Sequence, residues 1–405
     1  MNAATTHPLI GLALAGGGPV GGIYEVGAMA ALAEALEGVD FTAFGIYVGV
    51  SSGAFIAAAV ANGLGPDKLA RMLVENDTDE VFDPEMLLRP AFGEYLRRAL
   101  AVPVLFWSSL RQYLSDPWHL RPIEAFQSLS HAIPAGVFNS SGIDRLLRRL
   151  FSSGGRTNDF RQLKRRLYIV ATDLDTGESV AFGSPEHAEV PISVAVQASA
   201  ALPGLFPPVR IGERYFVDGA LIKTLHASVA LQAGAELLIC INPLVPFDSR
   251  LAAQRPLHEN PPHAPEHLVD GGLPVVLSQT FRAIIHSRMR TGMDRYRHEF
   301  KGRDVVLFEP TRDDVDMFFT NVFSYRGRSR LCEHAYQRTR SDLYRRRHEL
   351  RPILARHGIE LNLGVLKDHS RSLLPHKRRP DLATSAGALD ASLADLERWL
   401  RTQGA

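Results

Sequence analysis

Gly49-Val50-Ser51-Ser52-Gly53 follows the apolar run Phe44 to Val48 directly and precedes an alanine-rich stretch. A Gly-x-Ser-x-Gly sequence between a strand and a helix is typical of a nucleophile elbow, because small neighbours permit a turn too tight for larger side chains. The serine hydroxyl then lies at a helix N-terminus, where backbone N–H groups and the helix dipole favour developing negative charge. The alternative is an ordinary turn, since a chain with 33 glycines readily contains this pattern by chance. We predict that Ser51 is a nucleophile.

Strand and helix patterns alternate around this motif. We expect strands at 9–15 and 44–48, each followed by a helix, at 19–36 and 52–62. This order at this spacing predicts a parallel sheet and an α/β fold. Further expected elements are strands at 167–173, 179–182, 215–217 and 236–241 and helices at 191–201 and 224–233.

A second glycine-rich turn, Gly16-Gly17-Gly18, ends the first expected strand. In a parallel sheet this turn and the elbow open on the same edge, so its backbone N–H groups can face Ser51 and stabilise an oxyanion. The same residues also match Gly-x-Gly-x-x-Gly, which is typical of a dinucleotide site. That site needs an acidic residue at the end of the second strand, but Asp40 precedes that strand. We therefore expect no nucleotide cofactor.

The partner that deprotonates the serine is less clear from the residues alone. Asp218 in Asp218-Gly219-Ala220 follows a short apolar segment, and a partly buried carboxylate can act as a general base. Asp-Gly is also among the commonest turn dipeptides. His187 and His226 lie closest to the recognisable core elements, but neither belongs to an informative motif, and a surface or packed histidine is the simpler interpretation of each.

Composition excludes several other classes of protein. The 405 residues carry a net charge of +1, so we expect no nucleic-acid partner. The two cysteines, Cys240 and Cys332, are too few for a disulfide framework, and no histidine pair has metal-binding spacing, so we expect no metal. Residues 1–24 lack a positively charged n-region, and Gly16 to Pro19 interrupts their apolar stretch, so we expect no signal peptide and a cytoplasmic protein.

Regularity changes twice along the chain. Residues 83–140 are aromatic and proline-containing, which favours an insertion or lid, and 246–272 have the composition of a linker or mobile loop. From Leu277 to Phe300 apolar residues recur every three or four positions, which predicts an amphipathic helix. With an expected strand at 304–308 and helices at 329–349 and 389–400, residues 273–405 form a mainly helical C-terminal region.

Two features of this C-terminal region bear on partners. Residues 326–379 contain 15 Lys or Arg against 5 Asp or Glu, which favours either an anionic lipid surface or an ordinary solvated helical face. The amphipathic helix and the aromatic insertion can each contact a membrane peripherally, cover a catalytic cleft, or form core or a homo-oligomer contact. The sequence leaves these interpretations open.

Taken together, the motifs resemble those of the patatin-like phospholipases. That family combines a glycine-rich oxyanion loop, Gly-x-Ser-x-Gly and a downstream Asp-Gly-Ala or Asp-Gly-Gly. The corresponding segments here are 16–21, 49–53 and 218–220, and 198–203 with 206–208 also resemble the family's segment before the aspartate. Four motifs in the same order are more specific than any one of them.

The resemblance implies a three-layer fold with a mostly parallel sheet at 8–245 and hydrolysis of phospholipid or other lipid acyl esters. It implies a Ser-Asp dyad without histidine, with Ser51 as nucleophile and Asp218 as general base. The N–H groups at Gly16, Gly17 and Gly18 are the implied oxyanion donors. The rivals are an α/β-hydrolase with a histidine triad and a catalytically silent lipid-binding protein. One departure is Val20, where the family often has Arg or Lys.

Overall fold

The computed structural model describes residues 8–75, 107, 135–254, 267–320 and 325–374. Residues 1–369 form one compact unit, and 370–405 form a second, of which only 370–374 are described. The expected lid at 83–140 and the expected helix at 389–400 therefore lie mostly or entirely outside the described residues.

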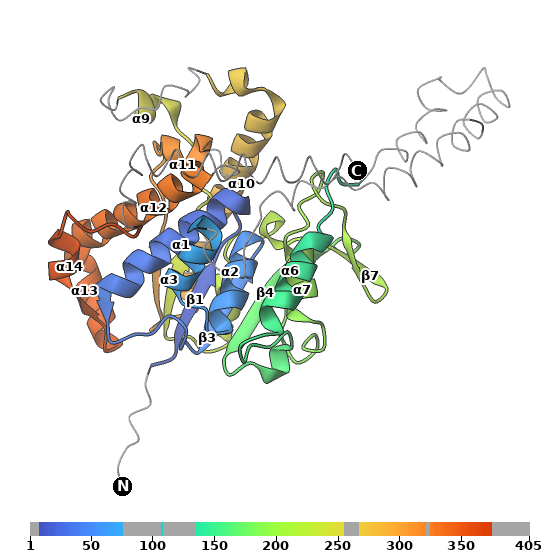
Figure 1. The fold of residues 1–405 in the computed structure, drawn as a ribbon, viewed down its shortest axis with the longest axis horizontal. Coiled ribbons are helices and arrows are strands. Elements are labelled where there is room, and N and C mark those ends of the chain that lie inside the picture. The colour runs from blue at the N-terminus through green and yellow to red at the C-terminus, as the bar shows by residue number, and fades with distance from the viewer. Residues whose placement is uncertain (1–7, 76–106, 108–134, 255–266, 321–324, 375–405) are drawn as a thin grey trace, which may run out of the picture. The chain divides into compact units, whose positions relative to one another are not determined.

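An eight-stranded mixed sheet forms the centre of the first unit (Figure 1). Its strand order is β6-β7-β4-β3-β1-β8-β9, and β5 pairs with β4. The strands are β1 Ile10–Leu14, β3 Ile46–Val50, β4 Arg166–Asp173, β5 Ser179–Phe182, β6 Val209–Ile211, β7 Arg214–Asp218, β8 Leu237–Ile241 and β9 Asp304–Phe308.

The prediction of a mostly parallel sheet is confirmed. The pairs β1–β3, β1–β8, β3–β4 and β8–β9 are parallel, whereas the three pairings that involve β5, β6 and β7 are antiparallel. The strand expected at 44–48 begins two residues later. Phe44 belongs instead to an aromatic cluster with Phe41 and Tyr47, whose hydroxyl donates to the Phe41 carbonyl (2.7 Å) and accepts from the Phe44 N–H (2.9 Å).

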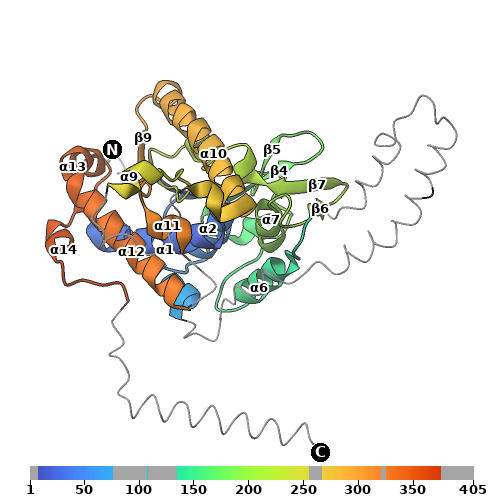
Figure 2. The ribbon, with the colours of Figure 1, turned by 90° about the horizontal axis from the view of Figure 1, so that it is seen from above.

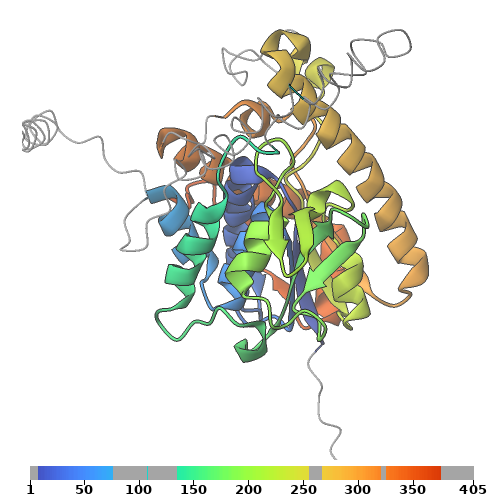
Figure 3. The same cartoon turned by 90° about the vertical axis from the view of Figure 1, so that its right-hand side faces the viewer.

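Helices cover both sides of the sheet, which gives the expected three layers (Figure 3). On one side α2 contacts β1, β3 and β4, α7 contacts β4, and α1 packs against α2. On the other side α8 and α10 pack over the middle strands. The helices up to residue 232 are α1 Gly18–Ala35, α2 Ser52–Ala61, α3 Pro66–Ala70, η1 Arg71–Glu75, α6 Ser141–Phe151, η4 Phe160–Gln162, α7 Ile192–Ser199, η5 Gly219–Leu221 and α8 Ala227–Gln232.

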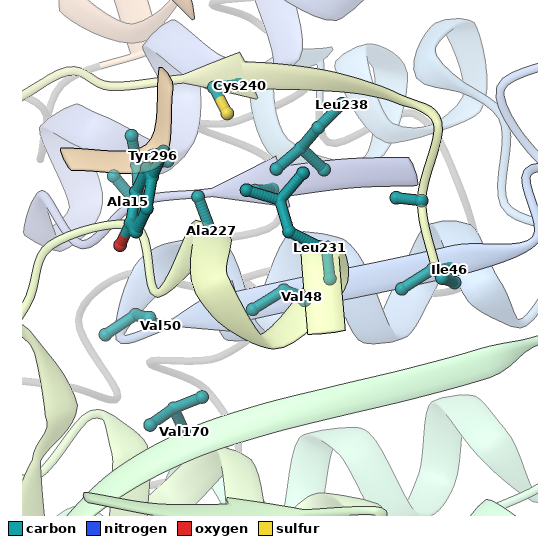
Figure 4. Close-up of a cluster of buried hydrophobic side chains, with 14 of the residues drawn as sticks. Ala15, Ile46, Val48, Val50, Val170, Ala227, Leu231, Leu238, Cys240 and Tyr296 are labelled. Atoms are coloured by element: carbon teal, nitrogen blue, oxygen red, sulfur yellow. The ribbon is translucent and has the colours of Figure 1, made fainter. Parts of the chain in front are cut away.

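The core beneath α8 shows how strand alternation builds this layer (Figure 4). Alternate residues of β1, β3 and β8 point to this face, including Ala13, Val48 and Leu238. The small side chains of Ala13 on β1 and of Ala15 just after it let α8 approach closely, and Tyr296 of α10 closes the cluster. Cys240 lies in this cluster and is a free thiol, as is the buried Cys332.

A tight hairpin joins β6 to β7. Ile211 pairs with Arg214, so only Gly212 and Glu213 lie between the strands. Gly212 has φ 61°, the backbone conformation that a two-residue type II′ turn needs at its first central position.

The C-terminal region returns to the same unit. Its elements are α9 Ser249–Ala253, η7 Leu268–Gly271, α10 Gly272–Glu299, β9, α11 Val315–Phe319, α12 Tyr325–Arg345, α13 Arg347–Arg356, α14 Leu363–Lys367 and the small antiparallel pair β10 Glu360–Leu361 with β2 Leu36–Glu37. β9 extends the main sheet beside β8, and α12 packs along α1 (Figure 2). A Cβ at Gly27 would overlap the carbonyl of Cys332, so glycine is required for this helix contact. The expected boundary at 245 thus lies inside one compact unit.

The amphipathic helix predicted from Leu277 is α10, but its apolar residues divide between two faces. Ile285, Met289 and Tyr296 are buried, whereas Leu277, Phe281 and Ile284 are exposed. By length and composition alone, Leu268–Glu299 is long and apolar enough to cross a membrane, since it contains an 18-residue window with a mean hydropathy of 1.2.

Candidate active site

Ser51 occupies a strained elbow between β3 and α2. Its φ of 54° and ψ of −121° lie outside the regions that non-glycine residues ordinarily adopt. A Cβ at Gly49 would lie 2.5 Å from the carbonyl oxygen of Gly53, and one at Gly53 would lie 2.5 Å from that of Ala15. Both glycines are therefore required by close backbone contacts, as the elbow interpretation of the sequence expects.

The register of β4 brings the end of β3 to the end of β7. β5 pairs with residues 169–172 of β4 along one edge. The other edge of β4 carries β3 up to the pair Val50–Val170 and then β7 from the pair Asp218–Ala171. Because β3 is parallel and β7 antiparallel to β4, their carboxyl ends point toward each other. The residue that follows β3 and the last residue of β7 therefore meet at one point beside β4.

Asp218 is the residue that meets Ser51 at this point. Its side chain is 2% exposed, and its Oδ1 accepts a hydrogen bond from the Ala220 N–H at 2.8 Å. The Ser51 side chain lies close enough to favour the carboxylate as well. Burial outweighs both effects and raises the pKa of Asp218 from 3.8 to about 6. The carboxylate is thus ionised at neutral pH but remains a stronger base than an exposed aspartate.

The glycine-rich turn lies directly against this pair. A Cβ at Gly16 would be 3.1 Å from the Ser51 Cβ and 3.0 Å from the Ala220 Cβ, so the turn approaches both. Gly17 N-caps α1, and Gly18 is its first residue. The first N–H groups of a helix have no intrahelical acceptor, so they are available to a substrate oxygen. The structure thus brings together all five site residues that the sequence predicts.

Ser199 is a contributor that the sequence motifs alone do not reveal. Its Oγ accepts a hydrogen bond from the Ser51 backbone N–H at 2.9 Å and donates to the Val170 carbonyl at 2.6 Å. The elbow is therefore tied to β4 through one buried hydroxyl. Its segment, 198–203, resembles the family pattern, but a serine in an alanine-rich helix carries no signal for this contact.

An apolar cavity of about 380 Å³, here named the apolar pocket, opens beside Ser51. Ser51 and Ser52 supply the only side-chain oxygens among the described residues that line it, and no charged side chain contributes. The Ser52 Oγ has no hydrogen-bond partner in the described part of the chain. The lining comes from α1, the elbow and α2, η1, the segment before α6, α6 itself, α7 and the segment after α7: Gly18, Pro19, Gly22, Ile23, Ser51, Ser52, Phe55, Ile56, Leu73, Phe138, Ile143, Val196, Ala200, Leu202, Leu205 and Phe206.

Neither candidate histidine contacts Ser51 through a hydrogen bond that the structure describes. His226 is buried, its Nε2 lies 3.2 Å from the Gly219 carbonyl oxygen, and burial lowers the pKa of its ring to about 4. The His187 ring contacts Phe182 edge-on, with centroids 5.8 Å apart. Both positions fit the packed-histidine interpretation.

No group of three His, Cys, Asp or Glu side chains within the described ranges has the geometry of a metal site. Asp40, weighed above for a dinucleotide, caps a local turn through hydrogen bonds from the N–H and hydroxyl of Thr42, both at 2.8 Å.

The fold and the site define a class of α/β protein in which a serine at a strand–helix elbow lies beside a buried aspartate and a glycine-rich turn. A family model described as patatin-like phospholipase matches residues 12–231, which is more than half of the chain. The chain belongs to the patatin-like phospholipase family.

Individual relatives are distant. Uncharacterized NTE family proteins of Mycobacterium bovis and Mycobacterium tuberculosis are each 34% identical over 113 residues, which is 28% of this chain and 18% of theirs. The matched part is thus a small fraction of those proteins' length. Among solved structures, VipD from Legionella pneumophila has a TM-score of 0.38 at 15% identity, covering 82% of this chain and 66% of VipD. The type III effector protein ExoU has a TM-score of 0.35 at 18% identity, with 84% and 53% coverage.

Proposed function

We propose that this protein is a serine-dependent lipid acyl hydrolase that works through a Ser51–Asp218 dyad and an acyl-enzyme. The observation that carries the proposal is the placement of Ser51 beside the buried carboxyl group of Asp218, at the edge of an apolar pocket. Membership in the patatin-like phospholipase family supports a lipid ester as the substrate class.

In the first step Ser51 Oγ attacks the ester carbonyl carbon, and its proton passes to the Asp218 carboxylate. Charge that develops on the carbonyl oxygen is stabilised by N–H groups of the turn at Gly17 and Gly18 and by the α1 N-terminus. The proton then moves to the departing alcohol oxygen as the C–O bond breaks. Water attacks the acyl-enzyme, gives a proton to Asp218 and releases the fatty acid, after which the proton returns to Ser51.

The pocket indicates which part of the substrate is recognised. Its apolar lining excludes a charged head group but suits an acyl chain, whose burial contributes about 0.8 kcal/mol per methylene. Head-group preference must therefore come from residues outside this lining. Val20, in the first turn of α1, adds no positive charge there.

The direct test is hydrolysis of p-nitrophenyl octanoate by wild type and by Ser51→Ala, with Ser179→Ala as an exposed serine control. We expect Ser51→Ala to lose at least about 10³-fold in kcat and to resist a fluorophosphonate probe, because the nucleophile is gone. Ser179→Ala should behave as wild type. A Ser51→Ala enzyme with full activity, or a folded wild type that the probe never labels, would contradict the proposal. A panel of phospholipids, glycerides and short esters then identifies the substrate.

The same assay separates the dyad from a histidine triad. A triad requires that loss of its histidine lower kcat by several orders of magnitude. With Asp218 as base, His187→Ala and His226→Ala should both still be labelled by the fluorophosphonate.

We also propose that the outward face of α10 contacts a lipid surface. Leu273, Phe281 and Ile284 are 69%, 43% and 48% exposed and lie on one side of the helix. Arg288 and Arg295 follow on the same side of the helix, but Arg288 turns to the Leu221 carbonyl and Arg295 pairs with Glu299, so the proposed lipid contact rests on the apolar side chains. The competing interpretation of this apolar face is a homo-oligomer contact.

Sedimentation with anionic phospholipid vesicles distinguishes the two interpretations. The Phe281→Ser/Ile284→Ser variant should bind vesicles several-fold more weakly, whereas Leu174→Ser, which removes an exposed leucine elsewhere, should not. If the wild type is oligomeric by light scattering and only the α10 variant becomes monomeric, the face is an oligomer contact instead.

A further inference from the structure

A second cavity, here named the basic pocket, lies between α10 and the segment that follows Asp218. Its volume of about 300 Å³ is at the lower end of the range for small-molecule sites, about 300–1,000 Å³. One wall is the segment Ile222 to His226, and the other is formed by α10 from Ser287 to Tyr296.

Three cationic side chains line the basic pocket: Lys223, Arg288 and Arg295. No Asp or Glu belongs to its lining among the described residues. Arg295 is paired with Glu299 at 3.1 Å. Arg288 donates to the Leu221 carbonyl at 3.1 Å and forms no ion pair with a carboxylate of the described residues. The site therefore presents positive charge that a bound anion would balance.

A buried hydroxyl in the same wall lacks a partner. The Thr224 side chain is 2% exposed, and its Oγ1 has no hydrogen-bond partner among the described residues. Leaving a buried hydroxyl unpaired is unfavourable, so native structures usually supply a partner. A ligand oxygen in the basic pocket would be such a partner.

The backbone of this wall is also unusual. His226 has φ 44° and ψ 34°, and in the described part of the chain Ser51 is the only other non-glycine residue with a positive φ. Such conformations are costly and concentrate at functional sites. Burial keeps the pKa of the His226 ring at about 4, so the ring adds no charge at neutral pH.

The lining also includes a substantial apolar part. Leu225, Met289, Met293 and Tyr296 belong to it, beside the hydroxyl-bearing Ser287 and Thr291. A purely polar ion would leave this surface unused, whereas an amphiphile would cover it.

We propose that the basic pocket is a second ligand site, which binds a small amphiphile whose carboxylate or phosphate head contacts Lys223, Arg288 and Thr224. The apolar part of the ligand contacts Met289, Met293 and Tyr296. This site is separate from the apolar pocket, and its occupation does not depend on the proposed hydrolysis.

Calorimetric titration of the full chain carrying Ser51→Ala tests the proposal without turnover. The probes are octyl phosphate, octanoate and 1-octanol, which share one tail. Because the apolar pocket has no charged lining residue, it should not favour the anions. We expect at least one anion to bind about tenfold more tightly than 1-octanol, with a preference that weakens at high salt. Whichever anion binds more tightly identifies the head group.

Matched variants locate the binding. Lys223→Gln/Arg288→Gln should abolish the preference for the anion, whereas Arg297→Gln/Lys301→Gln, which removes the same charge from exposed positions, should retain it. Thr224→Val, which keeps the side-chain shape, should weaken binding of the anion several-fold. This single variant tests the proposal if the double variant does not fold. Equal binding of all three probes, or an equal loss in the control variant, would overturn the proposal.

Discussion

The apolar pocket and the basic pocket differ in charge although one short segment serves both. Asp218, which contacts Ser51 beside the apolar pocket, begins this segment, and His226, which lines the basic pocket, ends it. Among the described residues, Ser51 and Ser52 supply the only polar side-chain groups of the apolar pocket, so its proposed role is to select chain length and not charge. The basic pocket carries three cations and an unpartnered hydroxyl, so it can select an anion. The proposed chemistry and the proposed charge recognition are thus separated in space.

The largest expected effect is the loss of hydrolysis in an Asp218 variant whose basic pocket is unchanged. Asp218→Asn removes the proposed base, so kcat should fall by about 10³-fold, within the usual range for general-base catalysis. The wild-type rate should fall as pH drops below about 6, because Asp218 becomes protonated. Octyl phosphate binding should be unchanged. The exposed Asp175→Asn is the control, and a pH profile that Asp218→Asn shares with wild type would contradict this role.

Asp218→Asn should also be more stable than wild type above the pH at which Asp218 loses its proton. Burial raises the pKa of Asp218 from 3.8 to about 6, so the folded state holds the proton more tightly than the unfolded chain. Wild type therefore loses stability as pH rises through this window, by about 3 kcal/mol in total. Asp218→Asn avoids this loss, so in urea it should be more stable than wild type at pH 8 but not at pH 3.5. An equal difference at both pH values would exclude this cause.

A third prediction concerns the elbow alone. Gly53→Ala places a methyl group 2.5 Å from the carbonyl oxygens of Leu14 and Ala15, which are backbone atoms of β1 and the turn after it. Overpacking of this kind costs about 1–3 kcal/mol, so the unfolding midpoint and the hydrolysis rate should both fall. Gly65→Ala has its nearest neighbour at 3.9 Å and an ordinary φ of −65°, so it should be tolerated. Equal losses in both variants would show that the elbow is not specially constrained.

A fourth prediction sharpens the contrast between the pockets by filling one of them. Ala200→Leu adds three carbons to the apolar pocket, so kcat/KM for p-nitrophenyl octanoate should fall about tenfold, on the scale of a few buried methylenes. The acetate ester is the internal control, because its acyl group does not reach far into the pocket. Equal losses on both esters would mean that the acyl chain binds elsewhere.

The smallest expected effect concerns the hydroxyl behind the elbow. Ser199→Ala leaves the Ser51 N–H without its acceptor, and an unpaired buried group costs about 1–3 kcal/mol. We expect kcat to fall several-fold with KM unchanged. Ser193→Ala on the same helix removes a different buried hydroxyl, which donates to Asp144 at 2.6 Å, and should lower stability without changing kcat. If both variants lower kcat alike, Ser199 acts only through stability.

Much of the fold follows from local sequence. The strand–helix order around Ser51, the pair at 167–173 and 179–182 and the strand at 304–308 all follow from short-range patterns, and the structure has each of them. The glycine-rich turn and the elbow meet because parallel strands place their carboxyl ends at one edge.

What the sequence did not predict depends on long-range packing. The helix expected at 224–233 begins only at Ala227, because His226 adopts a left-handed conformation that no local signal marks. The spacing of apolar residues predicts one apolar face on α10. Leu277, Phe281 and Ile284 are nevertheless exposed, because the helix packs through its opposite face. The Ser199 contact joins residues 148 positions apart, so no local pattern contains it. The roles of Ser51 and Asp218 remain predictions until the variants are measured.

The two-residue turn between β6 and β7 has a consequence for how this active site can evolve. Side chains alternate along a strand, so a slip of β7 by one residue would offer Val217 to Ser51 and turn Asp218 to the other face. The two-residue turn Gly212-Glu213 therefore fixes the register of β7 and with it the position of the Asp218 carboxylate. By contrast, more than one hundred residues separate β3 from β4, and the length of this connection does not determine how the two strands pair. Insertions between β3 and β4 leave the pairing of these strands unchanged. A single residue inserted in the hairpin would move Asp218 away from Ser51 and so remove the proposed base.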